Sequence, residues 1–398
     1  MSKNNAGQHY SIYWIMLLAL FTALGPLSID MYLPALPEMA DDFGVTTQQM
    51  SNTLPAYFLG LAIGQLFYGP ISDRIGRKKP LYFGMSVYAF ASILCLFAPN
   101  DWAMIGARIL QALGGCVGVV MARAAIRDKL DMQASAQAFA SMMIVMGLAP
   151  VLAPMIGALI LSFLSWQAIF VVLACVGLLC LCCVHFFFEE TLPADRRLNL
   201  NFKQVFLLYH SIFQDSSFRL PMLAGCLTGA ALFCYISSAA PVFLEHFKLE
   251  PQIFSYIFGL NAFGIMLFST LNKRLAQTLN IQQRLKLGGM IQIGGALLIC
   301  IVGFLNPNLL SLVMLGTFMT VAGIGFTGPN AMALAMAKQG SRAGTASAIM
   351  GSAQFACGLL GGVLLNFLTD SALTNMGIMM LLFTSLGCLA IFKLNQSS

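Results

Sequence analysis

The sequence predicts an all-α integral membrane protein with twelve transmembrane helices in two pseudo-symmetric six-helix bundles. The chain of 398 residues is 59% hydrophobic and only 9% charged, whereas soluble domains carry about 25% charged residues. Its apolar residues gather into runs of roughly 20, the length of a helix that crosses a bilayer. The runs lie near 12–33, 49–69, 80–98, 102–122, 136–161, 166–188, 218–241, 253–271, 286–305, 309–334, 344–368 and 373–393.

The distribution of cations predicts the orientation of these helices. Lysine and arginine concentrate in the cytoplasmic loops of membrane proteins. If the N-terminus lies in the cytoplasm, all but two of the 21 Lys and Arg fall in cytoplasmic segments; the exceptions are Lys248 in an outer loop and Arg108 within a span. We therefore expect both chain ends in the cytoplasm. The net charge of +6 reflects this bias and does not indicate nucleic-acid binding.

The longest cytoplasmic connection divides the twelve spans into six and six. We expect an N-terminal bundle over residues 1–188, a cytoplasmic linker over 189–217 and a C-terminal bundle over 218–398. Within the linker, Phe202–Tyr209 has the pattern of an amphipathic helix that lies at a membrane surface.

Two charged residues lie well inside predicted spans, Asp30 in the first and Arg108 in the fourth. Intramembrane charges are costly and by default functional. Both are expected at similar depth in the outer half, and two interpretations stay open. They form a static ion pair that locks the bundle, or Asp30 titrates with the hydration of the pathway and with Arg108, which makes the two residues the proton-coupling pair.

Small residues and prolines shape the fourth and fifth spans. Gly114 and Gly118 are spaced for close backbone approach between helices. The fifth span carries Gly147, Pro150, Pro154 and Gly157 at helical spacing, and its two prolines predict a bend. A kinked packing helix is the alternative to a functional motif.

A further set of polar residues inside spans is predicted to line a substrate pathway. Any of them could instead make an interhelical hydrogen bond. The set comprises Tyr57, Gln111, Tyr235, Asn261, Asn330 and Gln354.

The sequence does not indicate an enzyme. It contains no HExxH, GxSxG or Walker A motif, so we expect no catalytic residues, metal site or cofactor. Without ATP hydrolysis, the remaining source of energy for transport by a protein of this composition is an ion gradient.

Several segments resemble a known family. Gly69-Pro-Ile-Ser-Asp-Arg-Ile-Gly-Arg-Lys-Lys79 resembles the loop between the second and third helices of the major facilitator superfamily (MFS), and Arg108-x-x-Gln-x-x-Gly114 is similar to its fourth-helix motif. Pro26–Pro37 resembles the bicyclomycin-resistance (Bcr/CflA) drug:H+ antiporters. The fifth span resembles the antiporter motif of drug-exporting MFS members, whose core is Gly-Pro-x-x-Gly-Gly. This chain reads Ala153-Pro154-x-x-Gly157-Ala158, with alanine in place of the first and last glycines.

The resemblance implies the MFS fold, the inner membrane of a bacterium and a monomer in the lipid bilayer. It implies alternating-access export of small amphipathic drugs of the bicyclomycin, chloramphenicol or sulfonamide type in exchange for protons. The alternative is an MFS carrier for an endogenous metabolite such as an amino acid or small peptide.

The resemblance also assigns conformational gating to Asp73, Arg74, Gly76 and Arg77. Because a carboxylate is favoured at a helix N-terminus, we expect Asp73 to dock where the eleventh span begins, near Gly344, when the cytoplasmic side is closed.

Overall fold

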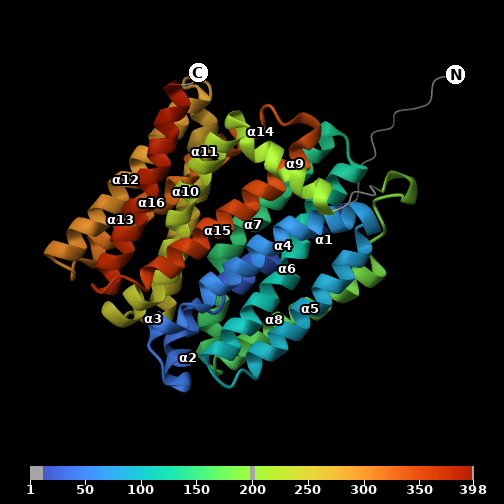
Figure 1. The fold of residues 1–398 in the computed structure, drawn as a ribbon. Coiled ribbons are helices and arrows are strands. Elements are labelled where there is room, and N and C mark those ends of the chain that lie inside the picture. The colour runs from blue at the N-terminus through green and yellow to red at the C-terminus, as the bar shows by residue number, and fades with distance from the viewer. Residues whose placement is uncertain (1–11, 198–201, 397–398) are drawn as a thin grey trace.

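The computed structural model describes residues 12–197 and 202–396, and within these ranges the chain forms helices and connecting turns without a strand (Figure 1). Twelve of the helical segments in this part are long and apolar enough to cross a membrane. This confirms the predicted all-α membrane fold.

The helices before the linker lie together on one side of the molecule (Figure 1). They are α1 (Ile12–Asp30), η1 (Leu33–Ala35), α2 (Leu36–Phe43), α3 (Thr47–Met50), α4 (Thr53–Ile75), α5 (Lys78–Leu96), α6 (Asp101–Lys129), α7 (Met132–Leu161) and α8 (Gln167–Phe186).

The helices after the linker lie on the other side (Figure 1). The linker holds η2 (Ala194–Arg196) and α9 (Phe202–Gln214), so the predicted amphipathic helix is present and longer than expected. The later elements are α10 (Ser216–Ala240), η3 (Pro241–His246), α11 (Pro251–Leu275), α12 (Ile281–Leu305), α13 (Leu310–Ala322), α14 (Ile324–Met336), η4 (Gly340–Arg342), α15 (Ala343–Leu365) and α16 (Ala372–Gln396).

The predicted spans near 12–33 and 49–69 leave residues 34–48 as an outer loop, and this expectation is wrong, because η1, α2 and α3 occupy the segment. The three acidic residues of α2 lower its hydropathy, but two of them are bonded: the Trp166 backbone N–H donates to Glu38 (3.2 Å) and the Trp166 indole donates to Asp42 (2.6 Å). The helix ends at Gly44, whose φ of +65° favours glycine. The first span therefore runs Ile12–Phe43, and Asp30 lies deeper than a span ending at residue 33 would place it.

The tenth span is interrupted at Gly323, between α13 and α14. Pro329 has no N–H for the carbonyl of Gly325 one turn earlier. That carbonyl instead accepts from Asn272 Nδ2 (3.4 Å) and Ser269 Oγ (3.5 Å) of α11. Pro329 thus lies inside α14, because a neighbouring helix replaces the hydrogen bond that its ring removes. At the break itself the Phe326 N–H donates to the Gly323 carbonyl (3.0 Å), which tightens the turn.

The glycines of α6 bring three helices of the first half close together. A Cβ on Gly114 would collide with the Tyr88 backbone of α5, and one on Gly118 would collide with the Phe21 carbonyl of α1. The expected close approach is confirmed. It seats α6, and with it Arg108, directly against α1.

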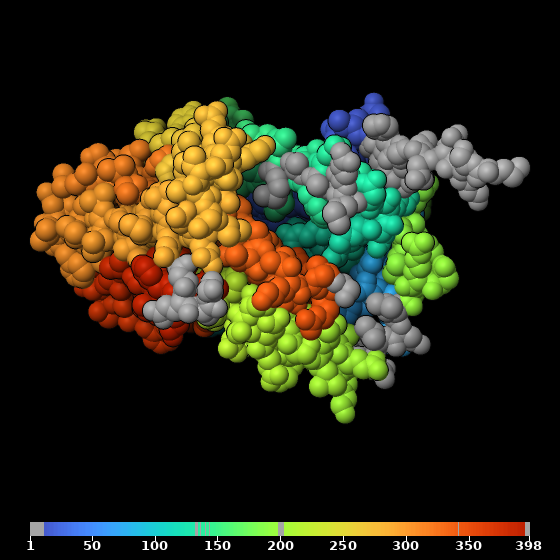
Figure 2. All heavy atoms as spheres, turned by 90° about the horizontal axis from the view of Figure 1, so that it is seen from above, coloured from blue at the N-terminus to red at the C-terminus, as the bar shows by residue number. Residues whose placement is uncertain are grey.

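The two halves meet along α4 with α15 and along α7 with α11. We call the face that carries the 69–80 turn and α9 the basic face. Far from this face, Asn366 Nδ2 donates to Asn52 Oδ1 (2.6 Å) and Gln252 Nε2 donates to Ser162 Oγ (2.9 Å). The basic face is hollowed between the halves instead (Figure 2). The molecule is therefore closed at one face and open at the other.

Candidate functional site

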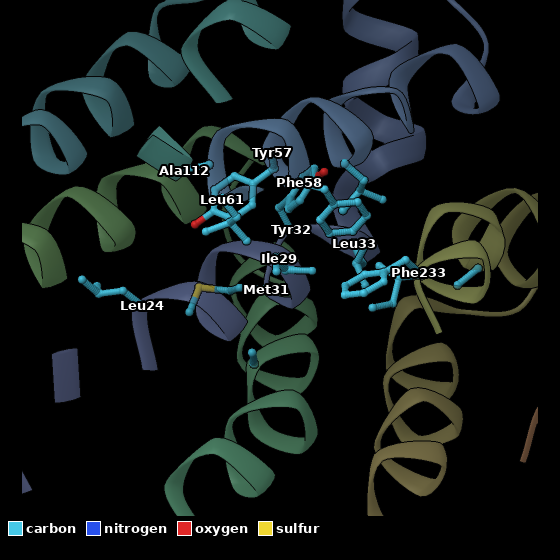
Figure 3. Close-up of a cluster of buried hydrophobic side chains, with 14 of the residues drawn as sticks. Leu24, Ile29, Met31, Tyr32, Leu33, Tyr57, Phe58, Leu61, Ala112 and Phe233 are labelled. Carbon is cyan, nitrogen blue, oxygen red and sulfur yellow. The ribbon is translucent and has the colours of Figure 1, made fainter. Parts of the chain in front are cut away.

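A central cavity of about 270 Å³ lies between the two halves and is lined by both. Its wall is mostly apolar: Ile29, Leu61 and Phe233, from α1, α4 and α10, lie in one buried cluster (Figure 3). The ionisable and amide side chains on its lining are Asp30, Gln65, Arg123, Tyr235, Asn261 and Gln354. An apolar wall with a few polar groups is the composition of a small-molecule site.

Asp30 is the last residue of α1, and 3% of its surface is exposed. Its Oδ1 is buried and accepts no hydrogen bond from any residue that the structure describes. A buried carboxylate without a partner is costly when charged. Across the same cavity, Asn261 Nδ2 donates to the Tyr235 hydroxyl at 2.8 Å. Asp30 is therefore free to respond to a proton or to a ligand in the cavity.

Arg108 is fully buried in α6 and forms no ion pair with Asp30. Its Nη1 donates to Gln111 Oε1 (2.6 Å) and its Nη2 donates to the Ser28 carbonyl (2.7 Å).

The Arg108 guanidinium also lies 4.2 Å from the ring centre of Tyr32 and 4.3 Å from that of Tyr57. Such stacking favours a cation that has left water. The last carbonyls of a helix have no intrahelical donor, so Arg108 caps the end of α1 two residues before Asp30. The ion-pair interpretation does not hold in this structure.

A second cavity of about 360 Å³ lies at the basic face, and we call it the mouth cavity. On its wall, Arg77 Nη1 contacts Asp73 (2.6 Å) and Arg77 Nε contacts Asp128 (2.8 Å). Burial alone would lower the pKa of Arg77, but the hydrogen bond to Asp128 and the charges of both aspartates raise it above its ordinary value. Arg77 therefore holds the turn after α4 against the end of α6.

Glu190 fixes the same turn from the linker. Its carboxylate accepts the backbone N–H groups of Arg77 (2.8 Å), Lys78 (3.2 Å) and Leu192 (3.0 Å). Burial would raise the pKa of Glu190, but these N–H donors and the charge of Arg197 hold it below its ordinary value. Gly76 has φ +95° and ψ 171°, and a Cβ there would collide with this carboxylate.

Comparison with known proteins assigns the family. The sequence profile of the Major Facilitator Superfamily matches residues 18–362. The chain belongs to the major facilitator superfamily. It is therefore a membrane transporter and not an enzyme.

Relatives along nearly the whole chain agree with this assignment. The MFS-type transporter YdgK of Bacillus subtilis (strain 168) is 32% identical over 96% of this chain and 94% of its own length. A bicyclomycin resistance protein homolog of Haemophilus influenzae is 29% identical over 96% of this chain and 95% of its own. The predicted resemblance is confirmed, and twelve spans with bacterial relatives imply the inner membrane.

Solved MFS structures share the fold. A bacterial homolog of the human lysosomal transporter Spinster superposes with a TM-score of 0.73 at 14% identity, covering 98% of this chain and 99% of that one. A D-xylose–proton symporter superposes with a TM-score of 0.72 at 14% identity, covering 94% and 96%.

In this MFS chain, half of the predicted pathway residues line the central cavity: Tyr235, Asn261 and Gln354. Gln111 instead bonds Arg108 and donates to Ser92 (2.8 Å), and Tyr57 packs on Arg108 with its hydroxyl unpaired. Asn330 donates to Asn272 (3.0 Å) on α11. For Gln111 and Asn330 the alternative of an interhelical hydrogen bond describes this structure.

The fifth-span residues of this MFS chain lie along the contact between the halves. Pro150 lines the central cavity, and the Pro154 carbonyl accepts from Ser255 Oγ of α11 (2.9 Å). Gly147 faces Met266 of α11, and Gly157 lies against the Met31 carbonyl. α7 therefore joins α1 to the opposite half.

Of the four residues to which the resemblance assigns gating, Asp73 and Arg77 line the mouth cavity and Arg74 is exposed. Asp73 is bonded to Arg77, and no hydrogen bond joins it to the first turn of α15 in the part of the chain that the structure describes. Arg127 lies at that turn instead, where its Nη1 is 2.7 Å from the position of a Cβ on Gly344. Docking of Asp73 stays a prediction for a state closed at the basic face.

Gln65 and Arg123 line both cavities, although neither is among the site residues predicted from the sequence. The fourth span was expected to end at residue 122, but α6 continues to Lys129. The predicted span near 102–122 therefore leaves Arg123 among the cations of a cytoplasmic loop. The available signal was helical spacing: Arg123 and Arg127 are one turn apart and continue the same helix.

Proposed function

We propose that this transporter exports small amphipathic drugs across the bacterial inner membrane in exchange for protons. The observation that carries the proposal is Asp30, a buried carboxylate with no protein partner on the wall of an apolar cavity shared by both halves. A carboxylate in such a place can bind a proton in one state and release it in another, because hydration of the pathway changes its environment.

The cycle we propose follows from the open and closed faces. The basic face is assigned to the cytoplasm, because cytoplasmic loops are rich in Lys and Arg. In the state seen here a drug would reach the central cavity from the cytoplasm and displace the proton from Asp30. The bundles 1–188 and 218–398 would then rock to open the opposite face, where Asp30 would take up a proton.

Arg108 has a positioning role in this proposal. By capping α1 at Ser28 it fixes the helix end that carries Asp30.

The membrane potential can supply the energy for export. One charge crossing 100 mV is worth about 2.3 kcal/mol, enough for accumulation of roughly fifty-fold per charge.

The test is proton release on addition of chloramphenicol to the purified wild-type protein and to Asp30→Asn in weakly buffered detergent. We expect release from the wild type and none from Asp30→Asn at matched drug occupancy. Equal release from both would place coupling elsewhere. Bound drug with no release from either would favour the metabolite carrier.

A further inference from the structure

We propose that Gln65 and Arg123 bind an anionic group of the transported solute where the central and mouth cavities join. The inference rests on the proposed transport function and adds to its neutral drug substrates amphiphiles that carry a carboxylate, sulfonate or phosphate. Both residues line both cavities. A solute that moves between the basic face and Asp30 therefore passes them.

Gln65 is a buried amide without a protein partner. It lies on α4, 5% of its surface is exposed, and its carboxamide makes no hydrogen bond with any residue that the structure describes. The carboxamide reaches across to α15, where a Cβ on Gly351 would collide with it. Buried polar side chains are nearly always hydrogen-bonded. An acceptor on a solute would satisfy the free N–H donors of Gln65.

Arg123 is a half-buried guanidinium without a counter-charge. Within residues 12–197 and 202–396 it makes no hydrogen bond or ion pair, and neither does Arg127 one turn later on α6. The aspartates of the mouth are engaged elsewhere, since Asp73 and Asp128 both bind Arg77 at 2.6 and 2.8 Å. Arg127 adds a like charge one helical turn from Arg123, so an anion beside Arg123 supplies a close counter-charge that the described residues do not.

The chemistry of the two side chains selects the ligand. A guanidinium offers only donors, in a planar arrangement that matches the two oxygens of a carboxylate, sulfonate or phosphate. The amide of Gln65 adds a donor of its own. The apolar wall formed by residues such as Leu61 and Phe233 receives the body of the solute. A lipophilic cation would meet Arg123 before it reached Asp30 and would be repelled.

Two dyes with the same anilinonaphthalene body test this inference: 8-anilinonaphthalene-1-sulfonate carries the anion and N-phenyl-1-naphthylamine does not. Equilibrium binding is measured on the full chain in phosphatidylcholine nanodiscs, with empty discs subtracted. We expect Arg123→Gln to weaken sulfonate binding at least tenfold and to leave neutral-dye binding within twofold. Gln65→Leu should weaken the sulfonate selectively too, and Arg123→Lys should recover part of the affinity.

Arg219→Gln is the matched control, because Arg219 lies in the first turns of α10 and lines neither cavity. Equal loss of both dyes in Arg123→Gln, or no loss of either, would overturn the inference. A sulfonate affinity that falls in phosphatidylglycerol discs for the wild type but not for Arg123→Gln would assign the site to a lipid headgroup and would also overturn it. Binding is measured without a gradient, so failure of proton-coupled export leaves this comparison intact.

Discussion

Arg108 donates to the backbone carbonyl of Ser28 at 2.7 Å and not to the carboxylate of Asp30. Arg108 and Asp30, the two charged side chains buried within the membrane spans of the first half, therefore do not pair with each other. Arg108 secures the end of α1, while Asp30 faces the cavity without a protein partner.

A double-mutant cycle tests this separation. Arg108→Gln should lower the free energy of unfolding by about 1–3 kcal/mol, because the shorter neutral amide cannot hold the Ser28 carbonyl and Gln111 together. Asp30→Asn should not lower it. Unfolding by sodium dodecyl sulfate in mixed micelles should give a coupling energy below about 0.5 kcal/mol between the two substitutions. A coupling above 1 kcal/mol would reinstate the ion pair.

Gly76→Ala is expected to destabilise the protein by about 1–3 kcal/mol, since φ +95° with ψ 171° is a conformation that essentially only glycine adopts. The substitution would also push the Glu190 carboxylate away from the turn. Gly69→Ala is the control, because it lies inside α4 with nothing near its Cβ position. The melting temperature in detergent should fall only for Gly76→Ala; equal shifts would contradict the role of backbone conformation.

Glu190 predicts a pH dependence of stability. Its pKa is lower in the folded chain than the ordinary value of 4.5, so its contribution is complete above pH 4.5 and disappears as the pH falls through the folded value. Glu190→Gln should therefore melt below the wild type at pH 7, and the gap should close as the pH drops below 4.5. A gap that stays constant from pH 7 to pH 3.5 would show that the charge of Glu190 does not contribute.

The contact between Asn52 and Asn366 predicts a reversible block of transport. Cysteines at both positions should be joined by a short bismethanethiosulfonate crosslinker that a reductant cleaves, because the two native side chains touch at 2.6 Å in the state closed at this face. Drug export in inverted vesicles should stop on crosslinking and return on reduction. Each single cysteine variant is the control, and full export by the crosslinked double variant would refute movement at this face.

The sequence by itself determined the twelve spans, because about 20 consecutive apolar residues suffice to cross the hydrocarbon core, whatever the rest of the chain does. It also singled out Asp30 and Arg108, since charges stand out in apolar runs. The sequence predicted a loop where the structure has α2, because the acidic residues of this helix lower its hydropathy. Two of them are bonded by Trp166, which only the folded chain brings near.

Tertiary structure decided which polar groups meet. The end of α1 at Asp30 left the Ser28 carbonyl without a donor, and the rotation of α6 brought Arg108 to it. The same rotation and the added length of α6 placed Arg123 on the wall of the two cavities that Gln65 also lines. Such partners depend on how helices distant in the sequence face one another, and a single sequence contains no local signal for that.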